Sequence, residues 1–295
     1  MNDYILFITE GKLPEKSIIN SIENNYLSSN IEIIQYSTTI YKLHEEIKNN
    51  IIFDDEDLFI DIGILLNIIS KQDNKNKVLT KDVQNSISEI YLFFDYDGHD
   101  DKANHQCFID MLRIFNNETK NGKLFISYPM IEAFKHKFKE QKLYPIFIKT
   151  QSDVLAKRSK DKWIKYYIQK SSHEILSKCQ FFPVYASEHY KTYVAKDENC
   201  HKDLEHISKS TKEIWNNALI NNIKATNYLI VGDFSFPKKY ESNIIEIFSQ
   251  KAIYNHQLDK FVNPINHVMV LSPFALFLLE YLGKPLFEEW QKIAN

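Results

Sequence analysis

The sequence predicts an α/β fold, in which a mostly parallel sheet is flanked by helices and followed by a mainly α-helical C-terminal region. Two observations predict it. Compact apolar runs typical of buried parallel strands alternate with helical periodicities over 1–150. From residue 151 onward, helical periodicities dominate. We therefore expect a sheet domain over 1–150 and a mainly α-helical domain over 151–295, which would bind a substrate or partner.

Five apolar runs are expected to form the strands of the sheet. They cover 4–9, 31–36, 89–94, 123–127 and 144–149. Because crossovers between parallel strands are right-handed, the carboxyl ends of these strands should lie along one edge. Ligands of open α/β sheets bind at that edge, so functional residues are sought there.

The segments between and after these runs have helical periodicity. Pro14 stands where the first helix would begin, and Ile18, Ile19 and Ile22 recur on one face. The other helices are expected at 38–49, 56–71, 103–116, 129–140, 153–178, 207–224, 240–257, 273–282 and 285–293. Residues 227–234 and 266–271 could form further strands.

Composition argues against several function classes. The six glycines lack the spacing of dinucleotide-binding or Walker loops, and a net charge of −3 offers no overall basic surface for a nucleic acid. Three scattered cysteines form no zinc or disulfide pattern and favour a reducing, cytoplasmic location. The longest apolar stretch, 269–283, is interrupted by Pro273 and Glu280, so we expect no membrane span.

Carboxylates stand at the ends of two expected strands. Glu10 follows the first strand, and Asp95 and Asp97 follow the third, where their i and i+2 positions would direct both side chains the same way. Clustered carboxylates repel one another unless a cation lies among them, and oxygen ligands suit Mg²⁺ or Mn²⁺. The alternative is that the aspartates cap the following helix and that Glu10 is a solvated loop residue.

These segments, ILFITEGK and IYLFFDYDGHD, resemble the TOPRIM domain of topoisomerases, primases and overcoming-lysogenization-defect nucleases. The resemblance covers about residues 4–149 and implies that Glu10, Asp95 and Asp97 are Mg²⁺ ligands, with Glu10 also a proton-transfer group. Many TOPRIM proteins have a second acid three residues after the first. Here position 13 is Leu and the nearest acid is Glu15.

The chain is most similar in organisation to small, stand-alone TOPRIM proteins of bacterial anti-phage defence, such as PARIS effectors and abortive-infection proteins. That resemblance implies a toxic nuclease that cleaves RNA, with tRNA one candidate, or DNA. It also implies an ATPase partner of the ABC/SMC type. The segment SYPMIEAF nominates Glu132 as a further ligand or supporting residue, although a first-turn acid favoured by the helix dipole is the simpler reading.

Basic residues supply candidates for charge stabilisation and for nucleic-acid binding. Lys12 stands beside the Glu-Gly turn, and Lys135 and Lys137 follow Glu132. A second basic group is interleaved with aromatic residues and contains Arg158, Lys160 and Lys162. Its alternative reading is the solvated face of an amphipathic helix. Other readings of the whole chain are a non-catalytic binding or assembly subunit, a homo-oligomer of either kind, or a polynucleotide-synthesising enzyme.

Overall fold

The structure is a computed structural model of the 295-residue chain. It describes residues 4–11, 14–27, 30–54, 57–72, 81–98, 100, 102–137, 181–183, 200–201, 204, 206–240, 244–265 and 267–295.

A five-stranded sheet lies at the centre of the first half. Its order is β2 (Asn30–Gln35), β1 (Tyr4–Thr9), β5 (Ile87–Asp95), β7 (Gly122–Ser127) and β6 (Asn116–Asn117). The first four strands are parallel, and the two-residue β6 is antiparallel to β7. The predicted α/β class with a mostly parallel sheet is therefore confirmed. The expected strand at 144–149 lies outside the described residues.

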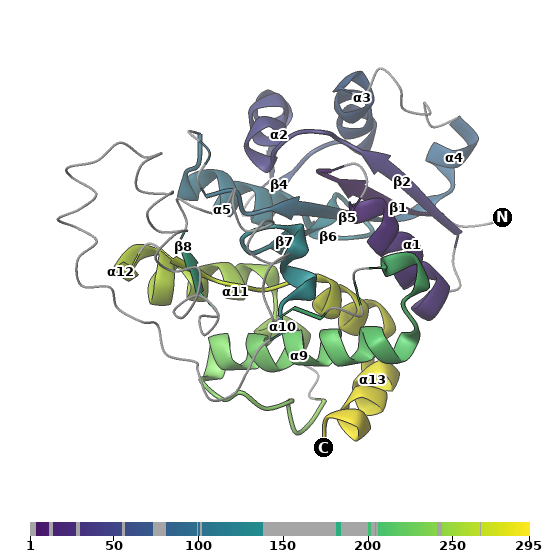
Figure 1. The fold of residues 1–295 in the computed structure, drawn as a ribbon. Coiled ribbons are helices and arrows are strands. Elements are labelled where there is room, and N and C mark those ends of the chain that lie inside the picture. The colour runs from purple at the N-terminus through teal and green to yellow at the C-terminus, as the bar shows by residue number, and fades with distance from the viewer. Residues whose placement is uncertain are drawn as a thin grey trace.

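Helices cover both faces of this sheet, as Figure 1 shows. In the first half they are α1 (Pro14–Tyr26), α2 (Ile40–Ile47), α3 (Ile62–Gln72), α4 (Lys81–Asn85) and α5 (His105–Ile114). Single 3₁₀ turns follow at Lys48–Asn50 and Ile131–Lys135. In the view of Figure 1, α2 and α3 lie above the sheet and the C-terminal helices α9 and α13 lie below it.

One expected helix, 56–71, is wrong in its first part. Residues of β3 (Ile52–Asp54) and β4 (Asp57–Phe59) pair as an antiparallel hairpin, and α3 begins only at Ile62. The side chain of Asp61 explains the boundary, because its Oδ1 accepts a hydrogen bond from Ile64 N at 3.1 Å. In the sequence, the apolar residues of β4 stand directly before those of α3, so the two elements look like one continuous helical segment.

The expected helix at 129–140 is also wrong as far as the structure describes it. After a cis Tyr128–Pro129 peptide, the chain makes only the short 3₁₀ turn Ile131–Lys135. His136 then leaves in an extended conformation and pairs with Cys200, while His201 N donates to Lys135 O at 2.8 Å. Pairing with a distant segment takes the backbone groups that a longer helix would have used.

The second half is mainly helical where it is described. Its helices are α9 (Lys212–Val231), α10 (Ile244–Ile247), α11 (Gln250–Gln257), α12 (Asn263–Ile265) and α13 (Phe274–Ala294), with a 3₁₀ turn at Ile207–Lys209 and a π turn at Leu258–Val262. The pair β8 (Phe181–Pro183) and β9 (His267–Met269) is antiparallel, so the strand expected near 266–271 is confirmed. The expected helix at 153–178 lies outside the described residues.

The strand suggested at 227–234 is wrong, because α9 continues through residue 231. The helix is capped by Thr211, whose side chain accepts from Ile214 N, and continues through the apolar run to Val231. Gly232 ends it with φ 83°, the left-handed conformation typical of a helix C-terminus. A short apolar run in a buried helix has the same sequence pattern as a buried strand, so the pattern alone does not distinguish the two.

Two further boundaries differ from expectation. The helix expected at 240–257 is divided, because Ser249 caps α11 through Ala252 N at 3.3 Å. The two helices expected at 273–282 and 285–293 follow each other as α13, which bends at Gly283 where φ is 61°. Both departures are local changes of backbone direction within a helical region.

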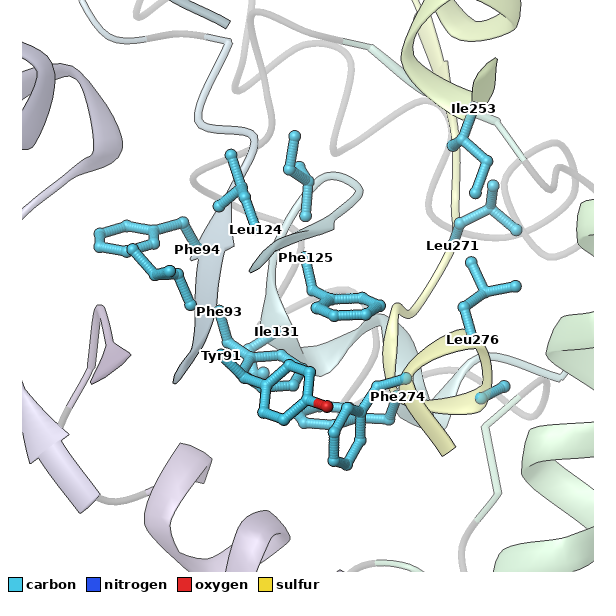
Figure 2. Packing of buried hydrophobic residues seen from close by; sticks show 14 of the residues in the cluster. Tyr91, Phe93, Phe94, Leu124, Phe125, Ile131, Ile253, Leu271, Phe274 and Leu276 are labelled. Carbon is cyan, nitrogen blue, oxygen red and sulfur yellow. The ribbon is translucent and has the colours of Figure 1, made fainter. Parts of the chain in front are cut away.

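Aromatic side chains join the sheet to α13. Phe93 stacks on Phe125 of the neighbouring strand at 5.4 Å between ring centroids and on Phe274 at 5.0 Å. Tyr91 meets Phe277 edge to face at 4.8 Å. Figure 2 shows Tyr91, Phe125 and Phe274 on one side of the strands, with Phe94 pointing away from them. One continuous hydrophobic core therefore includes residues from both halves of the chain.

The C-terminal half also closes the free edge of β7. Gln250 Oε1 accepts a hydrogen bond from Ile126 N at 3.1 Å, and Tyr128 exchanges two backbone hydrogen bonds of 2.9 Å with Leu271. The segment before α13 thus extends the sheet beside the end of β7. The contact with Leu271 lies just past the carboxyl end of β7, at the end of the sheet where the parallel strands terminate.

Candidate functional site

The backbone of two neighbouring strands brings Glu10 to the end of β5. Glu10 directly follows β1, and its N–H donates to Phe93 O at 3.2 Å. Its carboxylate then accepts a hydrogen bond from Asp95 N, with 3.0 Å between Oε2 and the nitrogen. The two strand ends are thereby tied together by the side chain of Glu10.

A bend just after β5 brings Asp97 to the same place. Asp95 is the last residue of the strand, whereas Asp97 lies beyond it with a φ of 40°, in the left-handed region. Tyr96 between them is anchored, because Tyr41 donates from its hydroxyl to Tyr96 O at 2.9 Å. The charge of Asp97 is one of the causes that raise the pKa of Glu10, so the two carboxyl groups lie close together. The bend, rather than strand alternation, accounts for this arrangement.

Glu15 is a fourth acid in this cluster, from the first turn of α1. Its side chain is 4% exposed and lies over Gly11, where a Cβ atom would come within 2.3 Å of Glu15 Oε1. Gly11 therefore leaves room for the carboxylate of Glu15.

Glu132 approaches the cluster from the 3₁₀ turn after β7. Its side chain is 7% exposed, and its charge contributes to the raised pKa of Asp95. The predicted position of Glu132 near the acids is thus consistent with the structure, although the helix expected to carry it is a short turn. Glu10, Asp95 and Asp97 are half-buried and retain some contact with solvent.

The environment resists full ionisation of this cluster, which we call the acid cluster (Glu10, Glu15, Asp95, Asp97 and Glu132). Burial raises the pKa of Glu10 well above its ordinary range, and the nearby charges of Asp97 and Glu15 raise it further. Burial also raises the pKa of Asp95, followed by the charges of Glu10 and Asp97.

The donor set suits a hard divalent cation, although its present arrangement is not that of a formed site. Carboxylate oxygens are the ligands that Mg²⁺ and Mn²⁺ prefer, and a cation among these acids would offset their mutual repulsion. Among the residues that the structure describes, however, no three His, Cys, Asp or Glu side chains are arranged so that they could hold a metal ion. The chemistry of the side chains fits the cation, whereas their arrangement in this structure does not form a complete site.

The basic candidates are only partly described. Lys135 is half-buried with its Nζ 5.5 Å from the centroid of the Phe134 ring, and Lys137 is exposed. Lys12, Arg158, Lys160 and Lys162 lie outside the described residues. The structure therefore gives no arrangement of basic residues around the acid cluster.

Comparisons with known protein families, with curated proteins and with solved structures find no match to this chain. The resemblance to TOPRIM proteins thus stays a prediction from the motifs around Glu10 and Asp95. Within the described residues, no helix has both the length and the apolar character to cross a membrane.

Proposed function

We propose that this chain is a divalent-cation-dependent nuclease of the TOPRIM type that hydrolyses phosphodiester bonds in RNA or DNA. The single observation that carries the proposal is the meeting of Glu10, Asp95 and Asp97 at the carboxyl edge of the sheet, tied by the Asp95 N to Glu10 Oε2 hydrogen bond. Glu10 and Asp95, which this hydrogen bond joins, are 85 residues apart in the sequence. Ligands of open α/β sheets bind at this edge.

The side chains have distinct roles in the proposed reaction. Glu10, Asp95 and Asp97 would hold the cation, and Glu15 and Glu132 would support them from the interior. A bound divalent cation supplies Lewis-acid stabilisation of a phosphodiester oxygen and a lowered pKa of bound water. Burial raises the pKa of Glu10, and a carboxyl group with a raised pKa is suited to accept or donate a proton in the reaction.

The activity is tested with tRNA, plasmid DNA and single-stranded DNA in Mg²⁺ or Mn²⁺. Glu10→Gln and Asp97→Asn should lower the cleavage rate at least about 100-fold, because each replaces a charged ligand by a neutral group of similar shape. Asp233→Asn is the matched control, because Asp233 is an exposed acid at the far end of α9. Equal cleavage by the wild type and both site variants would contradict the proposed chemistry.

A non-catalytic binding or assembly subunit is the second candidate. It is favoured by the absence, among the described side chains, of three ligands arranged for a metal. This candidate predicts no cleavage of any substrate with or without cation, and no calorimetric signal on addition of Mn²⁺. Binding of Mn²⁺ that is lost in Glu10→Gln would count against it.

The biological setting follows from the resemblance alone and is part of the same proposal. The chain would act as a toxic effector in bacterial anti-phage defence, restrained or triggered by an ATPase of the ABC/SMC type. Co-purification of the chain with an ATPase encoded beside it would support this setting. Cleavage assays should then be repeated with that partner and ATP, because a restrained effector can be inactive alone.

A further inference from the structure

A row of three polar residues crosses the end of the sheet beside the acid cluster. Asp95 of β5 pairs in register with Ser127, the last residue of β7. Tyr128 pairs antiparallel with Leu271, which places Ser272 opposite Ser127 on its other side. Paired residues of neighbouring strands direct their side chains to the same face of a sheet. The strand register therefore places Asp95, Ser127 and Ser272 side by side.

The two serine hydroxyls in this row are buried without a hydrogen-bond partner among the described residues. Ser127 is 0% exposed and Ser272 is 1% exposed, and the Oγ atom of each lacks both a donor and an acceptor. Less than 1 Å² of either oxygen is open to a water-sized sphere. Solvent therefore cannot satisfy them, and buried hydroxyls without partners are uncommon in folded proteins.

The backbone around the row is firmly held, so the unpartnered hydroxyls are not a sign of a loose segment. Ser127 O accepts a hydrogen bond from Tyr96 N at 2.9 Å, and Ser272 N donates to the buried Asn222 Oδ1 at 3.0 Å. Only the side-chain torsions of the serines are free to change. The nearest charged group in the row is the carboxyl of Asp95, one strand away from Ser127.

We propose that Ser127 is a positioning residue for Asp95: its hydroxyl would donate to the Asp95 carboxylate when Asp95 takes part in holding a cation, and Ser272 would support Ser127 from the next strand. This inference rests on the proposed function, because it assigns Ser127 a role at the same site. Carboxylates that bind metal ions generally accept hydrogen bonds from a second layer of residues, which fix their orientation. A serine hydroxyl has one proton to donate and suits this role.

The test compares cation affinity with stability in Ser127→Ala. Removing the hydroxyl should weaken Mn²⁺ binding about 10-fold in titration calorimetry. In the presence of a chelator, the same variant should melt at the wild-type temperature or above it, because the deleted hydroxyl makes no hydrogen bond in the fold. Ser272→Ala should show a smaller loss of affinity in the same direction.

Ser21→Ala is the matched control. Ser21 is also buried, but its Oγ accepts from Trp215 Nε1 at 2.9 Å and donates to Ile207 O at 3.0 Å. Its removal should lower the melting temperature and leave Mn²⁺ affinity unchanged. The inference is overturned if Ser127→Ala binds Mn²⁺ like the wild type, or if it destabilises the chelated protein as Ser21→Ala does. A wild type that binds no Mn²⁺ would instead refute the proposed function, and this inference with it.

Discussion

Glu10 accepts a hydrogen bond from the backbone of Asp95 while it lies beside the carboxyl of Asp97. At the scale of single residues, the acid cluster thus combines one stabilising contact with several repulsive ones. The strand-end positions of Glu10, Asp95 and Asp97 could be predicted from sequence, because apolar runs locate strand ends. Glu15 and Ser127 could not be recognised as neighbours of these acids. The side chain of Glu15 reaches the cluster by packing over Gly11, and Ser127 lies beside Asp95 because of the register between β5 and β7.

The raised pKa of Glu10 makes stability depend on pH. Above its ordinary value of 4.5, the unfolded chain loses a proton that the folded protein retains. Stability from this group therefore falls as the pH rises from that value through the raised pKa. Glu10→Gln keeps an acceptor for Asp95 N–H and removes the charge. With a chelator at pH 8, we expect it to be more stable than the wild type, because the variant no longer places a charge among the neighbouring acids in a buried site.

Urea denaturation at pH 5 and pH 8 measures this difference. The gain should be larger at pH 8, and added Mg²⁺ should stabilise the wild type but not the variant. Glu246→Gln serves as the control, because Glu246 is an exposed acid on α10. A variant that is less stable than the wild type at both pH values would show that the charge of Glu10 does not destabilise the folded protein.

At the scale of elements, α11 shows how a helix completes a sheet. Gln250 at its start accepts from Ile126 N of β7. Gln257 at its end both donates to Met269 O at 2.7 Å and accepts from Met269 N at 2.9 Å. Two buried amides on one helix thus replace the backbone partners that another strand would have supplied. Sequence patterns locate the helix, but they do not tell which of its polar residues turn inward.

Gln250→Leu tests this role of α11. The substitution keeps the size of the side chain and leaves Ile126 N–H buried without an acceptor. We expect a loss of about 1–3 kcal/mol in the free energy of unfolding, measured by urea denaturation. Gln106→Leu, on the exposed face of α5, should change it by less than about 0.5 kcal/mol. Equal effects of the two substitutions would mean that Gln250 is not needed at the sheet edge.

At the scale of the whole molecule, α13 holds the two halves of the chain together. Phe277 contacts Phe7, Tyr91, Phe93 and Phe125, which come from three strands, with ring centroids 4.8–5.8 Å apart. Without this helix, the aromatic face of the sheet would be open to water. The acid cluster lies at the end of the same strands, so its geometry depends on this packing.

Phe277→Ala should therefore destabilise the entire protein. A buried Phe→Ala substitution removes about 3–5 kcal/mol through lost burial and the cavity left behind. We expect tryptophan fluorescence and far-ultraviolet circular dichroism to report one shared, earlier transition in urea. Ile293→Ala is the control, since Ile293 lies near the end of the same helix and is 48% exposed. Separate transitions of the two probes would indicate that the halves unfold independently.

The order of apolar runs, and the acids at the ends of two of them, could be derived from the sequence, because strand burial and chain direction leave a local pattern in the residues. The structure differs from the predicted helix at 129–140, because His136 pairs with Cys200, which is far away in the chain. It differs from the predicted strand at 227–234, because this segment is buried as part of α9. Tertiary structure alone decided that Glu15 joins the acids, and that Ser272 stands across from Ser127. These contacts form between elements that are distant in the chain, so no local sequence pattern predicts them.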